Sequence, residues 1–216
     1  MKPKEYFFIT VALILMSCVG EAQDAWVLKG QKDGIKVFTR NNNGSSVKSV
    51  KAECTITASM TSLIALLLDI ENSKEWIYAT KSVSLLKEIS PAEIIYYSEV
   101  GLPWPISNRD FIVSFSITQD SITNVVTATS INRPDYLPRK KDIVRVEHSY
   151  SQWVISPLAG GRLNVQYELQ VDPGGNIPAC LINLFATTGP LYTFQKLREQ
   201  LKKSEYKDIS LAFIKD

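Results

Sequence analysis

The stretch Asp172-Pro173-Gly174-Gly175-Asn176-Ile177-Pro178 stands directly before a long run of residues with the spacing of an amphipathic helix. Pro178 suits the first turn of such a helix, because the N–H group that proline lacks has no helical partner there. Basic residues gather toward the other end, where positive charge favours the helix dipole. The sequence therefore predicts a terminal helix over residues 179–203. Its predicted inward stripe is Leu181, Leu184, Thr188, Leu191, Phe194, Leu197 and Leu201.

Segments in which apolar and polar residues alternate precede this helix, and such alternation is typical of half-buried strands. They number roughly eight: residues 35–40, 47–57, 83–89, 93–100, 111–118, 121–130, 142–155 and 163–171. The apolar phase shifts within the seventh segment, which predicts a β-bulge between Tyr150 and Trp153. A short helix is expected over residues 63–69, capped by Ser59 or Thr61, and a further helical turn over residues 71–76.

These elements predict an α+β fold in which one curved, mostly antiparallel sheet wraps around the terminal helix. A sheet that is apolar on one face must cover that face. The helix over residues 179–203 is the only predicted element long enough to do so. No internal repeat, low-complexity tract or Pro/Gly/Ser-rich linker divides the chain, so a single domain is expected over residues 23–216.

Charge is nearly balanced along the 216 residues, with 24 Lys and Arg against 22 Asp and Glu. This balance gives no reason to expect a nucleic-acid partner. No His/Cys cluster has the spacing of a metal site, and no cofactor is expected. Cys54 and Cys180 are interpreted as small buried hydrophobes, with a disulfide between them as the alternative. We expect the protein to be a monomer.

The N-terminal residues 1–22 have the features of a secretory signal peptide. Lys2 and Lys4 supply positive charge, residues 7–19 form an apolar run too short to span a bilayer, and Ala22 places a small residue before the cleavage point. Export to the periplasm or the medium is therefore expected, with a mature chain that begins at Gln23. The alternative is a lipobox ending at Cys18, through which a lipid would anchor the protein.

A second informative segment reads Pro103-Trp104-Pro105-Ile106-Ser107-Asn108-Arg109-Asp110-Phe111-Ile112-Val113, about seventy residues before the first. Together with further matches in the same order, it resembles the START family, the steroidogenic-acute-regulatory-related lipid transfer domains. The further matches are residues 34–38, 96–97, 144–146, 153–158, 165–167, 172–178, 181–185 and 197–198. The resemblance extends from about Trp26 to Leu201 and implies a helix-grip fold that encloses a hydrophobic cavity.

The resemblance implies a carrier that binds a lipid or sterol-like ligand, with transient membrane contact when the ligand is exchanged. The lid would be the terminal helix together with the loop over residues 132–139. Some lipid-binding relatives carry a basic side chain in the strand after the Arg-Asp pair, whereas this chain has Val113, Ser114 and Phe115 there. The predicted ligand contacts are Tyr96, Phe111, Val113, Phe115, Tyr167, Leu181, Leu184, Phe185, Thr188 and Leu191.

Three features leave alternatives open. Trp104 is interpreted as a packed side chain, with contact to ligand or bilayer as the alternative. Arg109 and Asp110 are interpreted as a structural pair that orients the neighbouring loop, with a ligand contact at the cavity mouth as the alternative. Pro190 predicts a kink in the terminal helix, which is either static or a hinge for the lid.

No catalytic residue is predicted. His148 is the one histidine of the chain, no nucleophile or acid is recognisable beside it, and no Gly-x-Ser-x-Gly sequence occurs. The alternative function is an enzyme of the polyketide cyclase or hydratase type acting on a small hydrophobic substrate, because such enzymes share the helix-grip scaffold. A protein-binding module with little cavity is a third possibility.

Overall fold

The computed structural model describes residues 25–41, 48–175 and 177–216 of the chain. Within these ranges the helices are α2 (Met60–Leu68) and α3 (Ala179–Gln200), with short 3-10 helices η2 (Glu71–Glu75) and η3 (Ser204–Tyr206). The strands are β1 (Val27–Lys32), β2 (Ile35–Asn41), β3 (Lys48–Thr57), β4 (Thr80–Ser90), β5 (Glu93–Val100), β6 (Asn108–Gln119), β7 (Val126–Asn132), β8 (Ile143–Arg145), β9 (His148–Leu158) and β10 (Arg162–Asp172). The predicted signal peptide lies outside the described residues.

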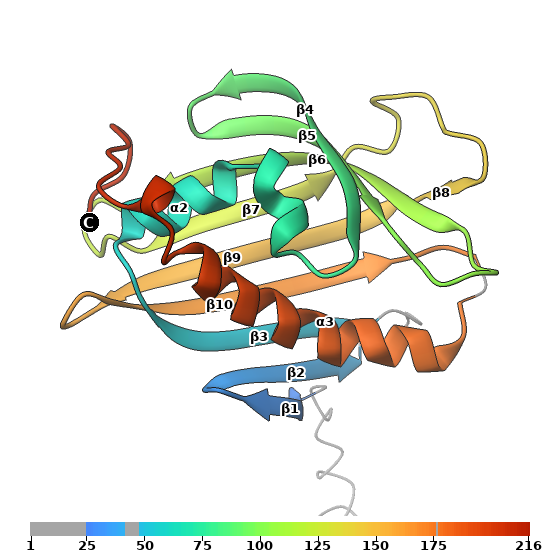
Figure 1. Cartoon of the computed structure of the whole chain (residues 1–216), viewed down its shortest axis with the longest axis horizontal. Coiled ribbons are helices and arrows are strands. Elements are labelled where there is room, and N and C mark those ends of the chain that lie inside the picture. Colours follow the sequence, from blue (N-terminus) through green and yellow to red (C-terminus); the bar gives the residue numbers. More distant parts are fainter. Residues whose placement is uncertain (1–24, 42–47, 176) are drawn as a thin grey trace, which may run out of the picture.

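One sheet contains all ten of these strands. The path through the sheet is β1-β2-β3-β10-β9-β7-β6-β5-β4, with antiparallel neighbours throughout. The short strand β8 pairs with β6 in parallel from off this path. The sheet is curved, and α2 and α3 lie across its inner face (Figure 1). The predicted architecture, a curved antiparallel sheet around a C-terminal helix, is confirmed.

The strand that returns after β6 begins later than predicted. Asp120 Oδ1 accepts hydrogen bonds from the backbone N–H groups of Ile122 and Thr123, at 3.1 and 2.7 Å. These bonds hold the chain in a turn, because a carboxylate that satisfies nearby N–H groups competes with the strand ladder. β7 therefore begins only at Val126.

The predicted strand over residues 142–155 is two strands, and the predicted bulge between Tyr150 and Trp153 is wrong. β9 pairs with β7 and β10 without a register shift through both residues. The interruption lies earlier, between Arg145 and His148, where the chain passes from pairing with β6 to pairing with β7 and β10. The phase shift in the sequence therefore marks a change of partner strand.

The helix α2 begins at the predicted cap. The Oγ of Ser59 accepts a hydrogen bond from the backbone N–H of Ser62 at 3.0 Å, which satisfies one of the N–H groups that a helix start leaves without a partner. Leu63, Ile64 and Leu67 of this helix are buried in the hydrophobic core. α2 therefore covers part of the inner face of the sheet that α3 does not reach.

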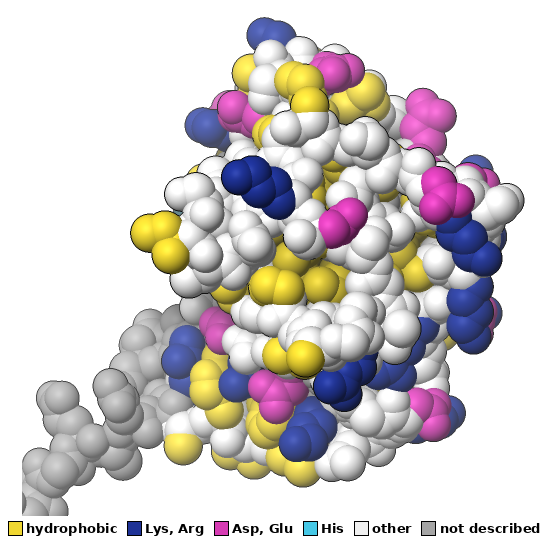
Figure 2. Space-filling model, turned by 90° about the vertical axis from the view of Figure 1, so that its left-hand side faces the viewer, with side chains coloured by type: hydrophobic (Ala, Val, Ile, Leu, Met, Phe, Trp, Pro, Cys, Tyr) yellow, Lys and Arg dark blue, Asp and Glu magenta, His cyan; other side chains and the backbone are white. Residues whose placement is uncertain are grey.

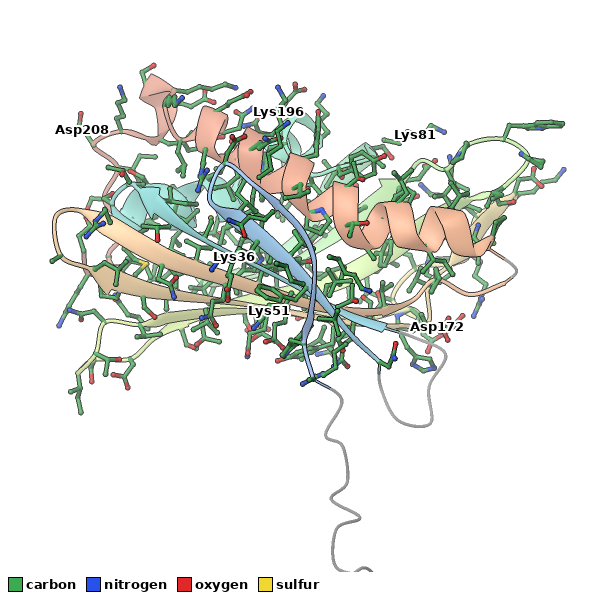
Figure 3. All side chains as sticks on the ribbon, turned by 90° about the horizontal axis from the view of Figure 1, so that it is seen from below. Lys36, Lys51, Lys81, Asp172, Lys196 and Asp208 are labelled. Atoms are coloured by element: carbon green, nitrogen blue, oxygen red, sulfur yellow. The ribbon has the colours of Figure 1, made fainter. Side chains whose placement is uncertain are left out.

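The helix α3 continues through Pro190 and ends at Gln200, three residues before the predicted end. Its axis changes direction part way along, as Figure 1 shows, and the view from below in Figure 3 shows the same change. A proline inside a helix removes one hydrogen bond and crowds the preceding turn, so a bend is expected there. At the neighbouring Gly189, a Cβ would lie 3.3 Å from Cδ1 of Tyr78, so glycine permits close contact at the bend.

Burial is uneven along the inner face of the sheet. On β10, Leu163 and Val165 are 3% and 0% exposed, whereas Tyr167, Leu169 and Val171 further along the same face are only half-buried. Because side chains two residues apart on a strand share a face, this change follows one continuous row. The inner face is thus filled at one end of the strand and less filled at the other.

The helix above shows the same change. Phe194 and Leu197 are 0% exposed, whereas Leu181 and Phe185, nearer the start of α3, are half-buried. We call the region around Leu163, Val165, Phe194 and Leu197 the packed end. The region around Tyr167, Leu169, Val171 and Leu181 is the open end. In Figure 1 the packed end lies on the left and the open end on the right.

Candidate functional site

Arg109 joins the two sequence segments that predicted the fold. Its Nη1 donates to the carbonyl oxygen of Ser107 at 2.6 Å, its Nε to that of Pro173 at 3.1 Å, and its Nη2 to that of Gly174 at 2.8 Å. The guanidinium therefore ties the loop before β6 to the segment that leads into α3. This arrangement agrees with a structural role for Arg109, although its partners are carbonyl groups and not Asp110.

The predicted strand residues of the site share the inner face. Tyr96 lies directly opposite Val113 in the β5–β6 pairing, and Phe111 and Phe115 lie two residues to either side of Val113. Val113 and Phe115 are 6% and 4% exposed, whereas Tyr96, Phe111 and Tyr167 are half-buried. The structure thus brings these five residues onto one curved surface, and along β6 the accessibility increases from Phe115 to Phe111, toward the open end.

Tyr96 and Tyr167 lie deep in the molecule yet keep accessible surface. Burial raises the pKa of both phenols, and the two rings are close enough to interact electrostatically. Ser130 and Ser151, which lie close to these phenols, are directly opposite each other on β7 and β9. Side chains that are surrounded by protein and still keep some accessible surface border space that protein atoms do not fill. The inner face is therefore incompletely filled beside these hydroxyls.

The helix residues of the predicted site divide into two groups. Leu181, Phe185 and Leu191 are half-buried, and Leu191 packs against the hydrophobic core. Leu184 is 39% exposed and Thr188 is also exposed, so the prediction that these two side chains face inward is wrong.

The error lies in the helical phase. The buried line of α3 passes through Leu197, Phe194 and Pro190. Steps of three and four residues back from Pro190 lead to Thr187 and Ala186, which are half-buried. The predicted stripe instead followed the largest apolar side chains. Before Pro190 in the sequence, this stripe no longer coincides with the buried face of the helix.

Tyr78 accounts for the position of Phe185. Its ring meets the rings of Phe185 and Tyr192 edge-on, with centroids 5.3 and 5.6 Å apart. The backbone N–H of Tyr78 donates to Oγ1 of Thr193 at 3.1 Å. The segment between η2 and β4 thus packs against the middle of α3 and is hydrogen-bonded to it.

Two tryptophans that are not among the predicted ligand contacts lie between the packed end and the open end. The ring of Trp153 stacks on Phe194 at 5.5 Å between centroids and lies 4.5 Å from the ring of Tyr167. Trp76 meets Trp153 edge-on at 6.5 Å. The alternation of β9 contained a signal for Trp153, but the misplaced bulge obscured it. Trp76 lies outside any periodic segment, so no pattern in the sequence indicated its position.

Asp110 points to the outer face of the sheet, where Arg145 binds it. Arg145 Nε and Nη2 donate to the two carboxylate oxygens at 2.7 and 3.0 Å, and both side chains are 1% exposed. A fork of two parallel hydrogen bonds is the strongest geometry for such a pair. The partner of Asp110 is therefore a residue 35 positions away, which adjacency in the sequence did not suggest.

The loop over residues 132–139 is fastened to this outer face. Arg145 donates to the carbonyl oxygens of Pro134, Leu137 and Pro138. Leu137 packs against the outer-face cluster of Ile95, Tyr97 and Ile112. The loop was predicted to form part of a lid, but it is held on the side of the sheet away from the inner face.

Trp104 is 92% exposed, so the prediction that it packs inside the protein is wrong. The loop that carries it projects from the open end (Figure 1). Asn108 fixes the base of this loop, because its Oδ1 accepts from the backbone N–H of Leu102 at 3.2 Å and its Nδ2 donates to Glu99 at 2.6 Å. A large amphipathic ring is thus presented to the surroundings on a braced loop.

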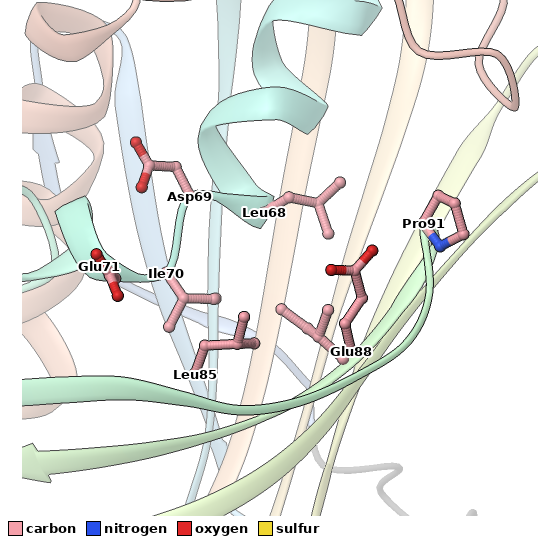
Figure 4. Close-up of a pocket in the computed structure, with 8 residues that line it drawn as sticks. Leu68, Asp69, Ile70, Glu71, Leu85, Glu88 and Pro91 are labelled. Atoms are coloured by element: carbon pink, nitrogen blue, oxygen red, sulfur yellow. The ribbon is translucent and has the colours of Figure 1, made fainter.

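A separate pocket of about 320 Å³ lies between the end of α2, η2 and the β4–β5 hairpin. Leu68, Leu85 and Glu88 point toward one another in it, whereas Asp69 points away (Figure 4). The Asp69 carboxylate accepts a hydrogen bond from the Tyr206 hydroxyl at 2.7 Å. In the space-filling view from the packed end, hydrophobic side chains lie in recesses among polar ones (Figure 2). None of the predicted ligand contacts lines this pocket.

Among the described residues, no group of three or more His, Cys, Asp or Glu side chains is placed to hold a metal ion. Cys54 is buried with a free thiol. Burial raises the pKa of this thiol to about 11, an effect that Arg198 partly offsets. No helix in the same part of the chain is long and apolar enough to cross a membrane.

Comparison with known proteins gives consistent matches. A STAR-related lipid transfer protein of Xanthomonas axonopodis is 31% identical, with a TM-score of 0.76 over 83% of this chain and 100% of that one. An uncharacterised protein of Pseudomonas aeruginosa is 31% identical over 178 residues, 82% of this chain and 87% of its own length. The phosphatidylcholine transfer protein of Bos taurus is 28% identical over 171 residues, 76% of this chain and 78% of its own.

An aromatase/cyclase of Streptomyces shares the fold alone, at 12% identity and a TM-score of 0.52 over 72% of this chain and 94% of its own. The family model of the START domain matches residues 7–207. The sheet around α3 and the joint at Arg109 involve the same segments that resembled this family in the sequence. The chain belongs to the START domain family.

Proposed function

We propose that this protein binds a lipid or similarly hydrophobic ligand between the sheet and the N-terminal half of α3, and transfers it between membranes. The observation that carries the proposal is the half-burial of inward-facing Tyr96, Tyr167 and Leu169, on a face whose other end is fully buried. Burial of an alkyl chain contributes about 0.8 kcal/mol per methylene group. An incompletely filled apolar face therefore gains stability when such a chain enters.

The names of the relatives support this function. Two of the matched proteins, from Xanthomonas axonopodis and Bos taurus, are named for lipid transfer. The alternative function predicted from the sequence is an enzyme of the polyketide cyclase type. The aromatase/cyclase of Streptomyces shares only its fold with this chain, and a fold does not determine a function. We therefore favour a carrier over an enzyme.

Ligand exchange takes place at a membrane surface in this proposal, through the open end. Trp104 is 92% exposed, and Ile182 and Leu184 at the start of α3 are 40% and 39% exposed. Arg109 joins the segments that carry these side chains. Tryptophan suits a boundary between apolar and polar surroundings, so this end is the part of the molecule best suited to enter a bilayer surface.

The N-terminal half of α3 is the moving part in this proposal. The C-terminal half is fastened, because Arg198 donates to the carbonyl oxygens of Asp33 and Thr55 at 2.6 and 2.9 Å. Pro190 lies between the two halves and lacks the N–H group that would brace the bend. Opening about this point would expose the inner face without disturbing the packed end.

We also propose that the protein is exported, with cleavage before Gln23, and that it acts as a monomer. The support is the charge of Lys2 and Lys4 followed by the apolar run over residues 7–19. N-terminal sequencing of protein recovered from the periplasm or medium tests the cleavage. An intact Met1 would contradict export. A lipid on Cys18 would show that the protein is anchored to a membrane and is not released as a free protein.

Native mass spectrometry of protein purified without detergent tests the function. We expect a bound mass in the range of a lipid, released by organic extraction. A small polar metabolite in its place would favour the enzyme. Protein that remains without any adduct after incubation with phospholipid vesicles would contradict the proposal.

A further inference from the structure

We propose that the ligand is a neutral lipid whose polar group is a free hydroxyl, and that this hydroxyl binds beside Tyr96 and Asn132. The inference rests on the proposed function and names the ligand class for the same site. Its basis is the set of polar groups that the inner face offers at the open end.

The first observation is a group of hydroxyls without charge. Tyr96, Ser130, Ser151 and Tyr167 lie on the inner face, and the two serines lie opposite each other in adjacent strands. Each hydroxyl can both donate and accept. The face therefore offers a patch of interchangeable hydrogen-bond partners in otherwise apolar surroundings.

The second observation is an acceptor without a donor. Asn132 lies in one cross-strand row with Tyr96, because both are paired with Val113 from opposite sides. Its Nδ2 donates to the carbonyl oxygen of Val146 at 2.5 Å, which fixes the orientation of the amide. Its Oδ1 is buried and accepts no hydrogen bond from the described residues. Buried polar atoms without partners are rare in native proteins, so this oxygen calls for a donor that the ligand can supply.

The third observation concerns charge. The described charged side chains that are buried are Glu99, Arg109, Asp110 and Arg145. Asp110 and Arg145 bind each other on the outer face, and Glu99 on the same face accepts from Lys81 at 3.0 Å. Arg109 already donates to three carbonyl oxygens. Glu99, Asp110 and Arg145 therefore have partners of opposite charge without a ligand, and backbone carbonyl oxygens accept hydrogen bonds from Arg109.

The lid adds no charge to this face. Residues 173–195, which include the N-terminal half of α3 and the segment before it, contain no Asp, Glu, Lys, Arg or His. A phosphate or ammonium group under this helix would lose its hydration without gaining an opposite charge from the helix, which is unfavourable. A hydroxyl loses little, because it donates to Asn132 and accepts from the phenol of Tyr96.

The test offers the full-length purified protein a choice of lipids. Vesicles of dioleoylphosphatidylcholine and dioleoylphosphatidylglycerol carry a minor fraction of dioleoylglycerol or of its acetylated analogue, which lacks the donor. The protein is separated from the vesicles and its bound lipid is identified by mass spectrometry. We expect enrichment of dioleoylglycerol over its share in the vesicles by about tenfold or more, the effect of one well-made hydrogen bond, and no such enrichment of the acetylated analogue.

Three variants locate the hydroxyl site. Tyr96→Phe keeps the ring and removes the hydroxyl, and Asn132→Leu removes the acceptor, so both should reduce the preference for dioleoylglycerol severalfold. Tyr97→Phe is the matched control, because Tyr97 lies on the same strand but faces the outer cluster, and it should keep the full preference. If Asn132→Leu fails to fold, the lipid preference of Tyr96→Phe alone tests the location of the hydroxyl site.

The outcomes separate this inference from the proposed function. Bound phospholipid in proportion to the vesicles, or in excess, would overturn the neutral ligand and leave lipid binding intact. Equal enrichment of dioleoylglycerol and its acetylated analogue would overturn the role of the hydroxyl. An unchanged preference in Tyr96→Phe would overturn the site. Protein that takes up no lipid at all would overturn the proposed function and this inference together.

Discussion

The packed end and the open end are built from the same strands and the same helix, but the inward-facing side chains are more deeply buried at the packed end. On β10, Val165 is fully buried and Val171, on the same face, is half-buried. On α3, Leu197 is fully buried and Leu181 is half-buried. The hydrophobic effect acts where water is excluded, so the packed end supplies most of the stability of the domain. The open end can then leave apolar surface for a ligand.

The polar contacts reinforce this division. At the packed end, Gln195 and Arg198 bind the β1–β2 turn at Asp33, with hydrogen bonds of 2.6 Å each. At the open end, the strong ion pair of Asp110 and Arg145 lies on the outer face of the sheet. The sheet is thereby braced from outside at the end where its inner face is least filled. Rigidity there does not require a filled interior.

The largest expected effect is on stability, and it compares two leucines of α3. Leu197→Ala should lower the free energy of unfolding by about 2–5 kcal/mol, because it leaves a cavity in a fully packed site. Leu181→Ala should cost less, about 1 kcal/mol, since that side chain is only half-buried. Urea denaturation followed by circular dichroism measures both. Equal losses would show that the two ends are equally packed and would break the comparison.

The second expected effect is on stability and lipid uptake, and it compares two valines of β10 that are each replaced by a larger side chain. Val165→Phe should destabilise the protein by about 1–3 kcal/mol, because a filled core has no room for added volume. Val171→Phe should be close to neutral for stability and should reduce the amount of lipid that the protein takes up from vesicles. A loss of stability as large for Val171→Phe as for Val165→Phe would mean that the open end has no spare volume.

Much of the fold could be predicted because alternation and helical spacing record which face of each element is buried. The rows on β6 and β10 were assigned correctly for this reason. The phase of α3 before Pro190 was not, because at the open end large apolar residues such as Leu184 are exposed and small or polar ones lie inward. Apolar size is a guide to burial only where the interior is filled.

Other features depend on partners that are distant in the sequence. The partner of Asp110 is Arg145, and the partner of Tyr206 is Asp69. No periodicity relates such residues, so only the pairing of strands and the docking of helices brings them together. The exposure of Trp104 belongs to the same class, because neighbouring prolines stiffen a loop without fixing where it points.

The third effect concerns membrane contact at the open end. Full burial of a large apolar side chain contributes about 1.5–3 kcal/mol. Partial insertion of the Trp104 indole should therefore contribute on the order of 1 kcal/mol, and Trp104→Ala should weaken vesicle binding severalfold. Stability should stay within about 0.5 kcal/mol of the original, as for other exposed sites. Vesicle co-sedimentation measures the binding.

Ile122→Ala is the control for Trp104→Ala, because Ile122 is 89% exposed in the turn between β6 and β7, away from the open end. It should leave vesicle binding unchanged. If both variants lose binding equally, membrane contact is spread over the surface and the open end has no special part in it.

The smallest effect is the response of the open end to acid. Burial alone would raise the pKa of Glu99, but hydrogen bonds from Lys81 and Asn108 outweigh it and hold the pKa below its ordinary value of 4.5. A carboxyl whose pKa is lower in the folded than in the unfolded protein stabilises the fold above the unfolded pKa. That stabilisation is lost as the pH falls through the folded pKa. Because Lys81 is 60% exposed, the contribution should be on the order of 0.5 kcal/mol.

Acid should therefore loosen the base of the Trp104 loop before it affects the packed end, because Asn108 links Glu99 to the backbone of Leu102. Hydrogen exchange between pH 6 and pH 3.5 should show residues 99–108 losing protection while residues 194–200 keep theirs (pH values chosen to bracket the ordinary carboxyl pKa). Glu99→Gln should remove the pH dependence of the first region, since an amide does not titrate in this range. If both regions lose protection together in the original protein, the two ends unfold as one unit and the packed end does not stand independently of the open one.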